Sequence, residues 1–141
     1  MAIRKAPVAA VKAAATEHSE QCALFEICRL HEGRYPALRN LFAVPNAAKR
    51  TPAVAHYMIS EGLKSGAPDM FLAHPGTLDG TVYPGIFIEM KREGFVPSDV
   101  KPSQRDWGDR LMTAGYAWRV CGGWQNAWSL VSAFLNIPAA L

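Results

Sequence analysis

The feature that most constrains this chain is an acid and a base placed two residues apart in an apolar run, Ile86-Phe87-Ile88-Glu89-Met90-Lys91. Runs rich in β-branched and aromatic residues are typical of buried strands. Side chains alternate between the two faces of a strand, so Glu89 and Lys91 share one face with Phe87, and the other face is wholly apolar. The pattern therefore predicts a strand that carries two charges on one face, where burial makes charge costly.

A second short strand is expected upstream, over Met70-Phe71-Leu72-Ala73, directly after Pro68-Asp69. Proline has no N–H to give to a sheet, so Pro68 fits best just before a strand. Asp79-Gly80 is a strong hairpin signal and predicts a turn between the two strands, with Asp79 as a turn residue and not a ligand. The two strands would bring Asp69, Glu89 and Lys91 close together.

This trio has two interpretations. Two carboxylates that converge from neighbouring strands form a hard-oxygen site for an ion such as Mg²⁺, which can hold a phosphate oxygen and lower the pKa of a bound water. Lys91 could then orient or deprotonate that water, or stabilise the charged transition state. The structural alternative is a Glu–Lys pair at a strand end, with Asp69 capping a turn.

The order of the motifs resembles the PD-(D/E)xK nuclease signature, and within it the VRR-NUC (virus-type replication-repair nuclease) branch. The resemblance covers about residues 17 to 135 and rests on Glu20, Val44-Pro45-Asn46 with Arg50, Gly66-Ala67-Pro68-Asp69, Glu89-Met90-Lys91, and Ser103-Gln104. One departure is the serine, because Ser103 directly precedes Gln104 and Ser98 stands in a looser upstream position. Each motif alone is weak, but five in the same order are specific.

The resemblance implies a site in which Asp69, Glu89, the Met90 carbonyl and Glu20 hold Mg²⁺ or Mn²⁺. Lys91 would position or activate water, and Gln104 would help to place the water or the DNA. Glu17 lies one turn before Glu20 and competes with it; Glu20 is favoured because Gln21 follows it, as in the family pattern. The expected DNA contacts are Lys49, Arg50, Lys64, Arg92, Lys101 and Arg105, and for Lys64 a solvent-exposed position without a ligand is an equal alternative.

The remaining pattern indicates an α/β fold in one domain. Residues 1–15 are expected to form a flexible tail, and residues 16–141 a single VRR-NUC-like domain. Helices are predicted from Thr16 or Ser19 to about Gly33 and over 47–60, 103–114 and 124–135, with further strands over 41–44 and 115–121. This order predicts a central mixed sheet flanked by helices, which agrees with the restriction-endonuclease-like core that the resemblance implies.

Composition limits the classes of function. Half of the 141 residues are hydrophobic, which argues against global disorder, and a net charge of +3 permits nucleic-acid binding without requiring it. No apolar run is long enough for a membrane span. The sequence also has no Gly-rich phosphate loop, the motif that would predict a nucleotide cofactor. Three cysteines without zinc spacing are most simply reduced thiols in a cytosolic protein.

The functional expectation is a metal-dependent DNA endonuclease that leaves a 5′-phosphate and a 3′-hydroxyl. The resemblance further implies branched DNA such as Holliday junctions or flaps, a homodimer, and a phage or prophage protein in the bacterial cytoplasm. Two alternatives remain from the sequence: a catalytically silent nucleic-acid-binding subunit, and a hydrolase of another phosphate ester.

Overall fold

The computed structural model describes residues 15–46 and 50–138, and all statements below refer to these residues. In chain order the elements are α1 (Glu17–His31), the 3-10 helix η1 (Pro36–Asn40), β1 (Leu41–Ala43), α2 (Pro52–Ser60), β2 (Met70–Leu72), β3 (Gly76–Leu78), β4 (Thr81–Tyr83), β5 (Ile86–Lys91), the 3-10 helix η2 (Pro97–Asp99), α3 (Pro102–Thr113), β6 (Ala117–Gly122) and α4 (Trp124–Leu135). None of the helices in these two ranges is long and apolar enough to cross a membrane.

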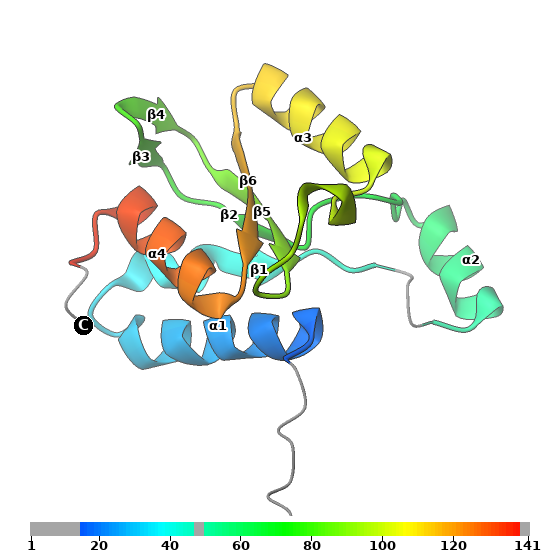
Figure 1. Ribbon diagram of the computed structural model, residues 1–141, viewed down its shortest axis with the longest axis horizontal. Helices are drawn as coiled ribbons and strands as arrows, with labels where there is room; N and C mark the ends of the chain where they lie inside the picture. Colours follow the sequence, from blue (N-terminus) through cyan, green and yellow to red (C-terminus); the bar gives the residue numbers. More distant parts are fainter. Residues whose placement is uncertain (1–14, 47–49, 139–141) are drawn as a thin grey trace, which may run out of the picture.

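The main sheet has four strands in the order β1-β2-β5-β6 (Figure 1). β1 pairs antiparallel with β2, and β2 pairs antiparallel with β5, with Met70 opposite Ile88. β5 and β6 run parallel over their full length, from Ile86 opposite Ala117 to Lys91 opposite Gly122. The expected mixed sheet is therefore confirmed, with β5 as its longest inner strand.

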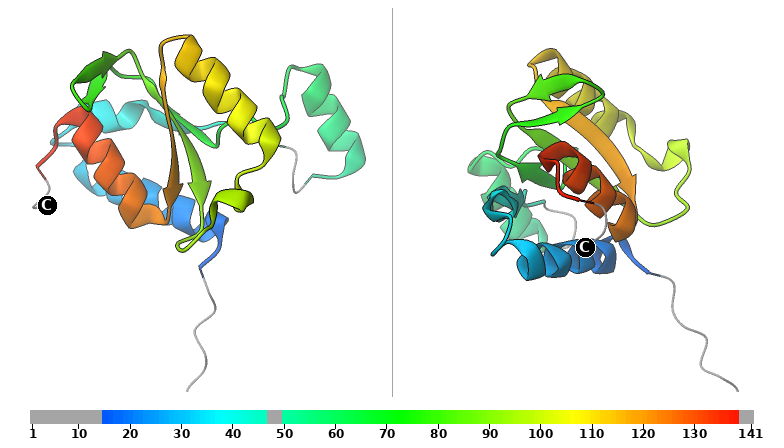
Figure 2. Two further views of the ribbon diagram at one scale, coloured as in Figure 1. Left: turned by 45° about the horizontal axis from the view of Figure 1, so that its top comes forward. Right: turned by 90° about the vertical axis from the view of Figure 1, so that its left-hand side faces the viewer.

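Helices cover both faces of this sheet, α1 and α4 on one side and α3 on the other (Figure 2). Ile86, Ile88 and Met90 are fully buried in a core that α1 and α4 complete. On the opposite side Gly108 of α3 lies against Trp118 of β6, where an added Cβ would come within 2.4 Å of the indole ring. A glycine is required there, because any larger residue would push α3 away from the sheet.

The predicted hairpin exists, but it does not join the two site strands directly. Asp79 and Gly80 have φ values of 50° and 78°, as a two-residue hairpin turn requires, and they connect β3 to β4. β3 and β4 form a separate two-stranded sheet inserted between β2 and β5. The predicted turn at Asp79-Gly80 is confirmed. It joins an additional pair of short strands, which the sequence pattern did not distinguish from the main sheet.

Two helix starts differ from the expectation. α2 begins at Pro52, where Thr51 caps it by accepting the N–H of Val54 at 3.3 Å, and residues 47–49 lie outside the described residues. α3 begins at Pro102 and has Lys101, not Ser103, at the capping position. Both corrections have the same cause, since proline is favoured at the first helical position. The proposed tail, residues 1–15, lies almost wholly outside the described residues, which begin at residue 15.

Candidate active site

The site is built where β5 extends beyond its antiparallel neighbour. Pairing with β2 ends at Ile88, so residues 89–91 have only β6 beside them. Asp69, which immediately precedes β2, occupies the free edge, and its Oδ2 accepts the Met90 N–H at 2.7 Å. The Asp69 carbonyl in turn accepts the N–H of Val44 at 2.7 Å, which fixes the segment after β1 beside it.

The Met90 carbonyl faces the same edge as the Asp69 carboxylate. In an extended strand the N–H and C=O of one residue point to the same neighbour. The Met90 N–H points to Asp69, whereas the carbonyl of Lys91 points the other way and accepts the N–H of Gly123 at 2.9 Å. The alternation therefore leaves the Met90 carbonyl outside the β6 ladder, next to Asp69.

Gln104 links the acid and the base of β5. Its Nε2 donates to Glu89 Oε1 at 2.8 Å, and its Oε1 accepts from Lys91 Nζ at 3.2 Å. The same oxygen accepts the backbone N–H of Lys101 at 2.9 Å, so the side chain is held at the start of α3. Gln104 therefore points toward the strands, and the predicted quartet of Asp69, Glu89, Lys91 and Gln104 lies together.

The carboxylates of this cluster are incompletely compensated. Glu89 is 2% exposed, and among the described residues no donor reaches its buried Oε2. Lys91 Nζ lies 3.8 Å from Glu89 Oε1, which is a loose ion pair. Burial, followed by the negative charge of Asp69, raises the pKa of Glu89 to about 9. Burial likewise raises the pKa of Asp69. The pair favours a proton or a cation between its members.

The structure places the two candidate glutamates of α1 in different surroundings. Glu20 is buried, and its Oε2 accepts the N–H of Trp124, the first residue of α4, at 2.5 Å. Glu17 instead lies 3.9 Å from Lys91 Nζ, and its charge acts on Asp69 and Glu89. Glu20 is thus engaged by the positive end of α4, and Glu17 is the glutamate of α1 that lies within ion-pair distance of Lys91.

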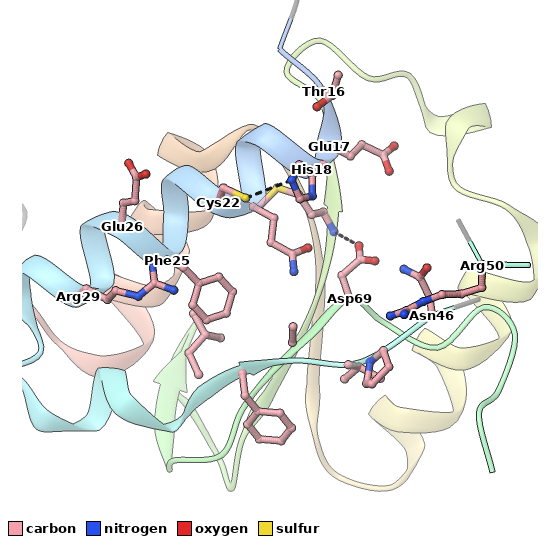
Figure 3. Close-up of a pocket in the computed structure, with 17 residues that line it drawn as sticks. Thr16, Glu17, His18, Cys22, Phe25, Glu26, Arg29, Asn46, Arg50 and Asp69 are labelled. Carbon is pink, nitrogen blue, oxygen red and sulfur yellow. Dashed lines mark hydrogen bonds between the residues drawn. The ribbon is translucent and has the colours of Figure 1, made fainter. Parts of the chain in front are cut away.

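A groove of about 1140 Å³ opens beside Asp69. Figure 3 shows α1 along one side of it, with Asn46 and Arg50 across from that helix and Asp69 between them. The Met90 backbone and the segment from Leu41 to Pro45 complete its lining. Glu89, Lys91 and Gln104 do not line the groove; Glu89 and Lys91 are buried, and Asp69 and Met90 are the residues of the cluster that reach it.

The predicted DNA contacts are scattered around this groove. Arg50 lines it, Lys64 lines a second cavity beside it, and Lys49 lies outside the described residues. Arg92 and Lys101 are exposed on the loop between β5 and α3.

Arg105 has a different role from the expected one. Its guanidinium donates to the carbonyls of Pro97 and Val100, with Nε 3.2 Å from the Val100 oxygen. These bonds hold η2 against the start of α3. They do not test whether Arg105 also contacts DNA, which stays a prediction.

Sequence reasoning missed one wall of the groove. This wall is formed by residues of α1, among them His18, Gln21, Cys22 and Arg29. His18 Nε2 lies 3.6 Å from Cys22 Sγ, four residues along the same helix. Residues 18, 22, 25 and 29 have the spacing of one helical face, which the sequence alone shows. The same spacing is equally typical of a partly exposed helix face that binds nothing.

The donor set fits a hard divalent cation. Among residues 15–46 and 50–138, no three His, Cys, Asp or Glu side chains converge as a metal site. Mg²⁺ is nevertheless bound typically through one or two carboxylates and keeps several waters. Asp69, Glu89 with its unpartnered Oε2, and the Met90 carbonyl provide that number of oxygens. The raised pKa values of both acids also favour a cation at this position, because a bound cation would replace the proton that the pair otherwise holds.

Comparison with known proteins agrees with the class that this geometry defines, a nuclease-like α/β fold. The VRR-NUC domain family matches residues 15–125, so the chain belongs to the VRR-NUC family. A solved structure described as a "VRR_NUC domain protein" superposes with a TM-score of 0.69 at 23% sequence identity. The aligned region covers 89% of this chain and 93% of the chain in that structure. That likeness establishes the shared fold. No curated protein matches the sequence.

Proposed function

We propose that the protein is an endodeoxyribonuclease that depends on Mg²⁺ or Mn²⁺ and hydrolyses phosphodiester bonds. The observation that carries this proposal is the cluster at the end of β5, where the buried Glu89, the half-buried Asp69, a lysine and a glutamine meet beside a groove. Glu89 Oε2 has no donor among the described residues, and the Lys91 ammonium, in a residue that is only 5% exposed, lies 3.8 Å from Glu89 Oε1. Family membership supports a nuclease.

In this proposal Asp69, Glu89 and the Met90 carbonyl hold the cation, and Glu17 contributes charge from α1. When bound, the cation polarises the scissile phosphate and lowers the pKa of a water. Lys91 holds the attacking water or the developing negative charge, because its Nζ is the donor nearest to Glu89 Oε1 apart from Gln104. Gln104 keeps Lys91 and Glu89 in register.

The groove along α1 is the proposed path for the DNA strand. Arg29 and Arg50 stand on opposite sides of it and can each contact a phosphate by a bidentate pair. Arg92 and Lys101 extend the same positive edge past the end of β5. The weak net charge of +3 means that such local cations, and not a general basic surface, would attract the backbone.

Branched DNA as substrate and a homodimer are further parts of the proposal. α2 contains no buried residue and stands away from the sheet (Figure 1). Its Val54, Tyr57 and Ile59 are 43%, 68% and 57% exposed, which is unusual for apolar residues on one short helix. A second copy that covers α2 would remove this surface from water and supply the second site that symmetric cleavage of a junction needs.

Phage or prophage origin and action in the bacterial cytoplasm belong to the same proposal and rest on the resemblance alone. No described element argues for a nucleotide cofactor, and the donor set of the site is one for a cation and a phosphate.

The test is cleavage of end-labelled four-way junction, flap and linear duplex DNA with Mg²⁺ or Mn²⁺, with Lys91→Ala as the variant. We expect metal-dependent cutting of a branched substrate, reduced on the order of 10²–10⁴-fold in the variant. Asp109→Asn, on the exposed face of α3, is the matched control. A folded protein that binds Mn²⁺ in calorimetry and cuts none of the three DNAs would exclude the proposal.

A further inference from the structure

A second cavity, of about 500 Å³, lies directly behind the wall of the groove. Val44 and Pro45 line both spaces, so this dipeptide is the partition between them. The partition is attached to the site itself, because the Val44 N–H donates to the Asp69 carbonyl at 2.7 Å. The second cavity is therefore separated from the groove at Asp69 by one short segment of backbone.

The cavity is bounded by elements that already carry the catalytic cluster. Phe87 lies two residues before Glu89 on the same face of β5, and Pro68 immediately precedes Asp69. Trp107 lies three residues after Gln104 on α3. These neighbours place the cavity beside the catalytic cluster, on the face of the sheet that Glu89 and Lys91 share.

Its walls are flat, apolar and held in place. The Trp107 Nε1 donates to the Ser65 carbonyl at 3.0 Å, and the Arg110 guanidinium lies 4.0 Å from the centre of the Trp107 ring. Phe87 stacks on Phe71 with ring centres 4.1 Å apart. The aromatic surfaces are thus oriented without a ligand, which reduces the entropy lost when a planar group binds between or against them.

The charges at the cavity identify the kind of ligand. Glu61 and Lys64 are the only charged residues in its described lining. A planar apolar ligand with polar edges, attached to an anionic backbone, matches this arrangement: stacking on the aromatic wall, hydrogen bonds to Glu61 and a phosphate contact from Lys64. A paired base cannot enter, since both of its faces are stacked in the duplex.

We propose that this cavity binds one unpaired nucleobase of the strand that is cut, next to the scissile phosphate. The inference rests on the proposed nuclease function and deepens it, because it makes an unpaired nucleotide at a branch or flap the feature that the protein recognises. Discrimination against continuous duplex then comes from this cavity and not from the groove.

The experiment first maps the cut in a branched DNA, then replaces each of the two nucleotides that flank it, in separate substrates, by an abasic tetrahydrofuran residue. Affinity is measured by fluorescence anisotropy in Ca²⁺, so binding is read without turnover. We expect one of the two abasic DNAs to bind wild type about 5- to 150-fold more weakly than the intact DNA, the range that loss of one stacked base produces.

The protein variant is Met58→Trp, which fills the cavity from α2, with His56→Trp as the control on the opposite, exposed face of that helix. Met58→Trp should bind intact and abasic DNA equally, and His56→Trp should retain the full difference. A second variant, Trp107→Leu, removes the stacking wall and should also abolish the difference; thermal unfolding of each variant confirms that it is folded.

The outcomes separate this inference from the proposed function. If wild type cuts the DNA normally and neither abasic substitution changes its affinity, the inference is overturned and the proposed nuclease function is unaffected. The inference is also overturned if neither abasic substitution changes affinity and light scattering shows that wild type is a dimer and Met58→Trp a monomer. In that case the cavity binds a second copy of the chain. Absence of cutting on every DNA overturns both.

Discussion

Two buried glutamates, Glu20 and Glu89, show how similar burial can serve opposite purposes. They are 6% and 2% exposed. The Glu20 carboxylate accepts the first N–H of α4 at 2.5 Å, where the helix dipole favours negative charge. Glu89 faces a second acid, and its Oε2 has no donor among the described residues. One carboxylate is satisfied by the fold, whereas the other keeps one oxygen without a donor among the described residues.

The difference teaches that burial alone does not identify a functional acid. A buried charge with a partner contributes to the structure, and its loss is felt in stability. A buried charge that repels its neighbour reduces the stability of the metal-free protein and is retained for another reason. The predictions below set these two effects against each other.

The largest effect is expected from Glu89→Gln. Replacement by a neutral amide removes one of the two carboxylates proposed to hold the cation, and cleavage should fall on the order of 10²–10⁴-fold. The measurement is single-turnover cleavage of the preferred branched DNA. Asp109→Asn should cut at the wild-type rate; a Glu89→Gln protein that does the same would remove Glu89 from the mechanism.

The second prediction concerns the pH dependence of stability without metal. The unfolded chain loses the Glu89 proton near pH 4.5, whereas the folded protein keeps it up to about 9. Between these values the folded state binds more protons, so the free energy of unfolding should fall as the pH rises.

Urea unfolding in EDTA at pH 5.5 and 8.5 measures this slope, and Glu89→Gln should flatten it and be the more stable protein at pH 8.5. Addition of Mg²⁺ should restore stability to wild type and have much less effect on the variant. Equal slopes for the two proteins would show that the Asp69–Glu89 pair is not protonated in the folded state.

The third prediction concerns the other glutamate, Glu20→Ala. Loss of its carboxylate leaves the Trp124 N–H at the buried start of α4 without its acceptor, which should cost about 1–3 kcal/mol in the free energy of unfolding. Glu20→Gln keeps an acceptor and should recover part of this loss. Cleavage per folded molecule should stay within about threefold of wild type, and a loss comparable to that of Glu89→Gln would return Glu20 to the metal site.

The smallest effect is expected from Glu17→Gln. Its side chain is 56% exposed, so the free energy of unfolding should change by less than about 0.5 kcal/mol. Because its charge acts on the cluster, Mn²⁺ affinity and cleavage should fall by about 10-fold, the scale of an outer-shell group. Isothermal titration with Mn²⁺ measures the affinity, and an unchanged value would confine Glu17 to the surface.

Local patterns in the sequence were sufficient for the strand that carries the site. The alternation in β5 correctly placed Glu89 and Lys91 on the face of Phe87, and the run from Trp124 to Leu135 correctly predicted α4. These features depend on residues within one or two turns of each other, so propensity and periodicity report them.

The features that local patterns did not reveal involve contacts between distant parts of the chain. Glu17 and Glu20 lie three residues apart and occupy nearly the same side of α1, so local pattern could not choose between them. The choice follows from α4, whose first N–H meets Glu20 across 104 residues. Arg105 was assigned to DNA because it is a cation beside the site, but η2 folds back and supplies carbonyls for its guanidinium.

By itself the sequence determined the strands of the main sheet, the order of the motifs and the four residues that meet at the end of β5, but not the separate pair β3 and β4. Only the tertiary structure decided which glutamate accompanies them, that α1 forms a wall of the groove, and that Val44 and Pro45 divide the groove from an aromatic cavity. The physical reason is that strand alternation and helix periodicity are set by neighbouring residues. The partner of a buried charge and the shape of a cavity are instead set by how whole elements pack, and that packing minimises a free energy to which the entire chain contributes.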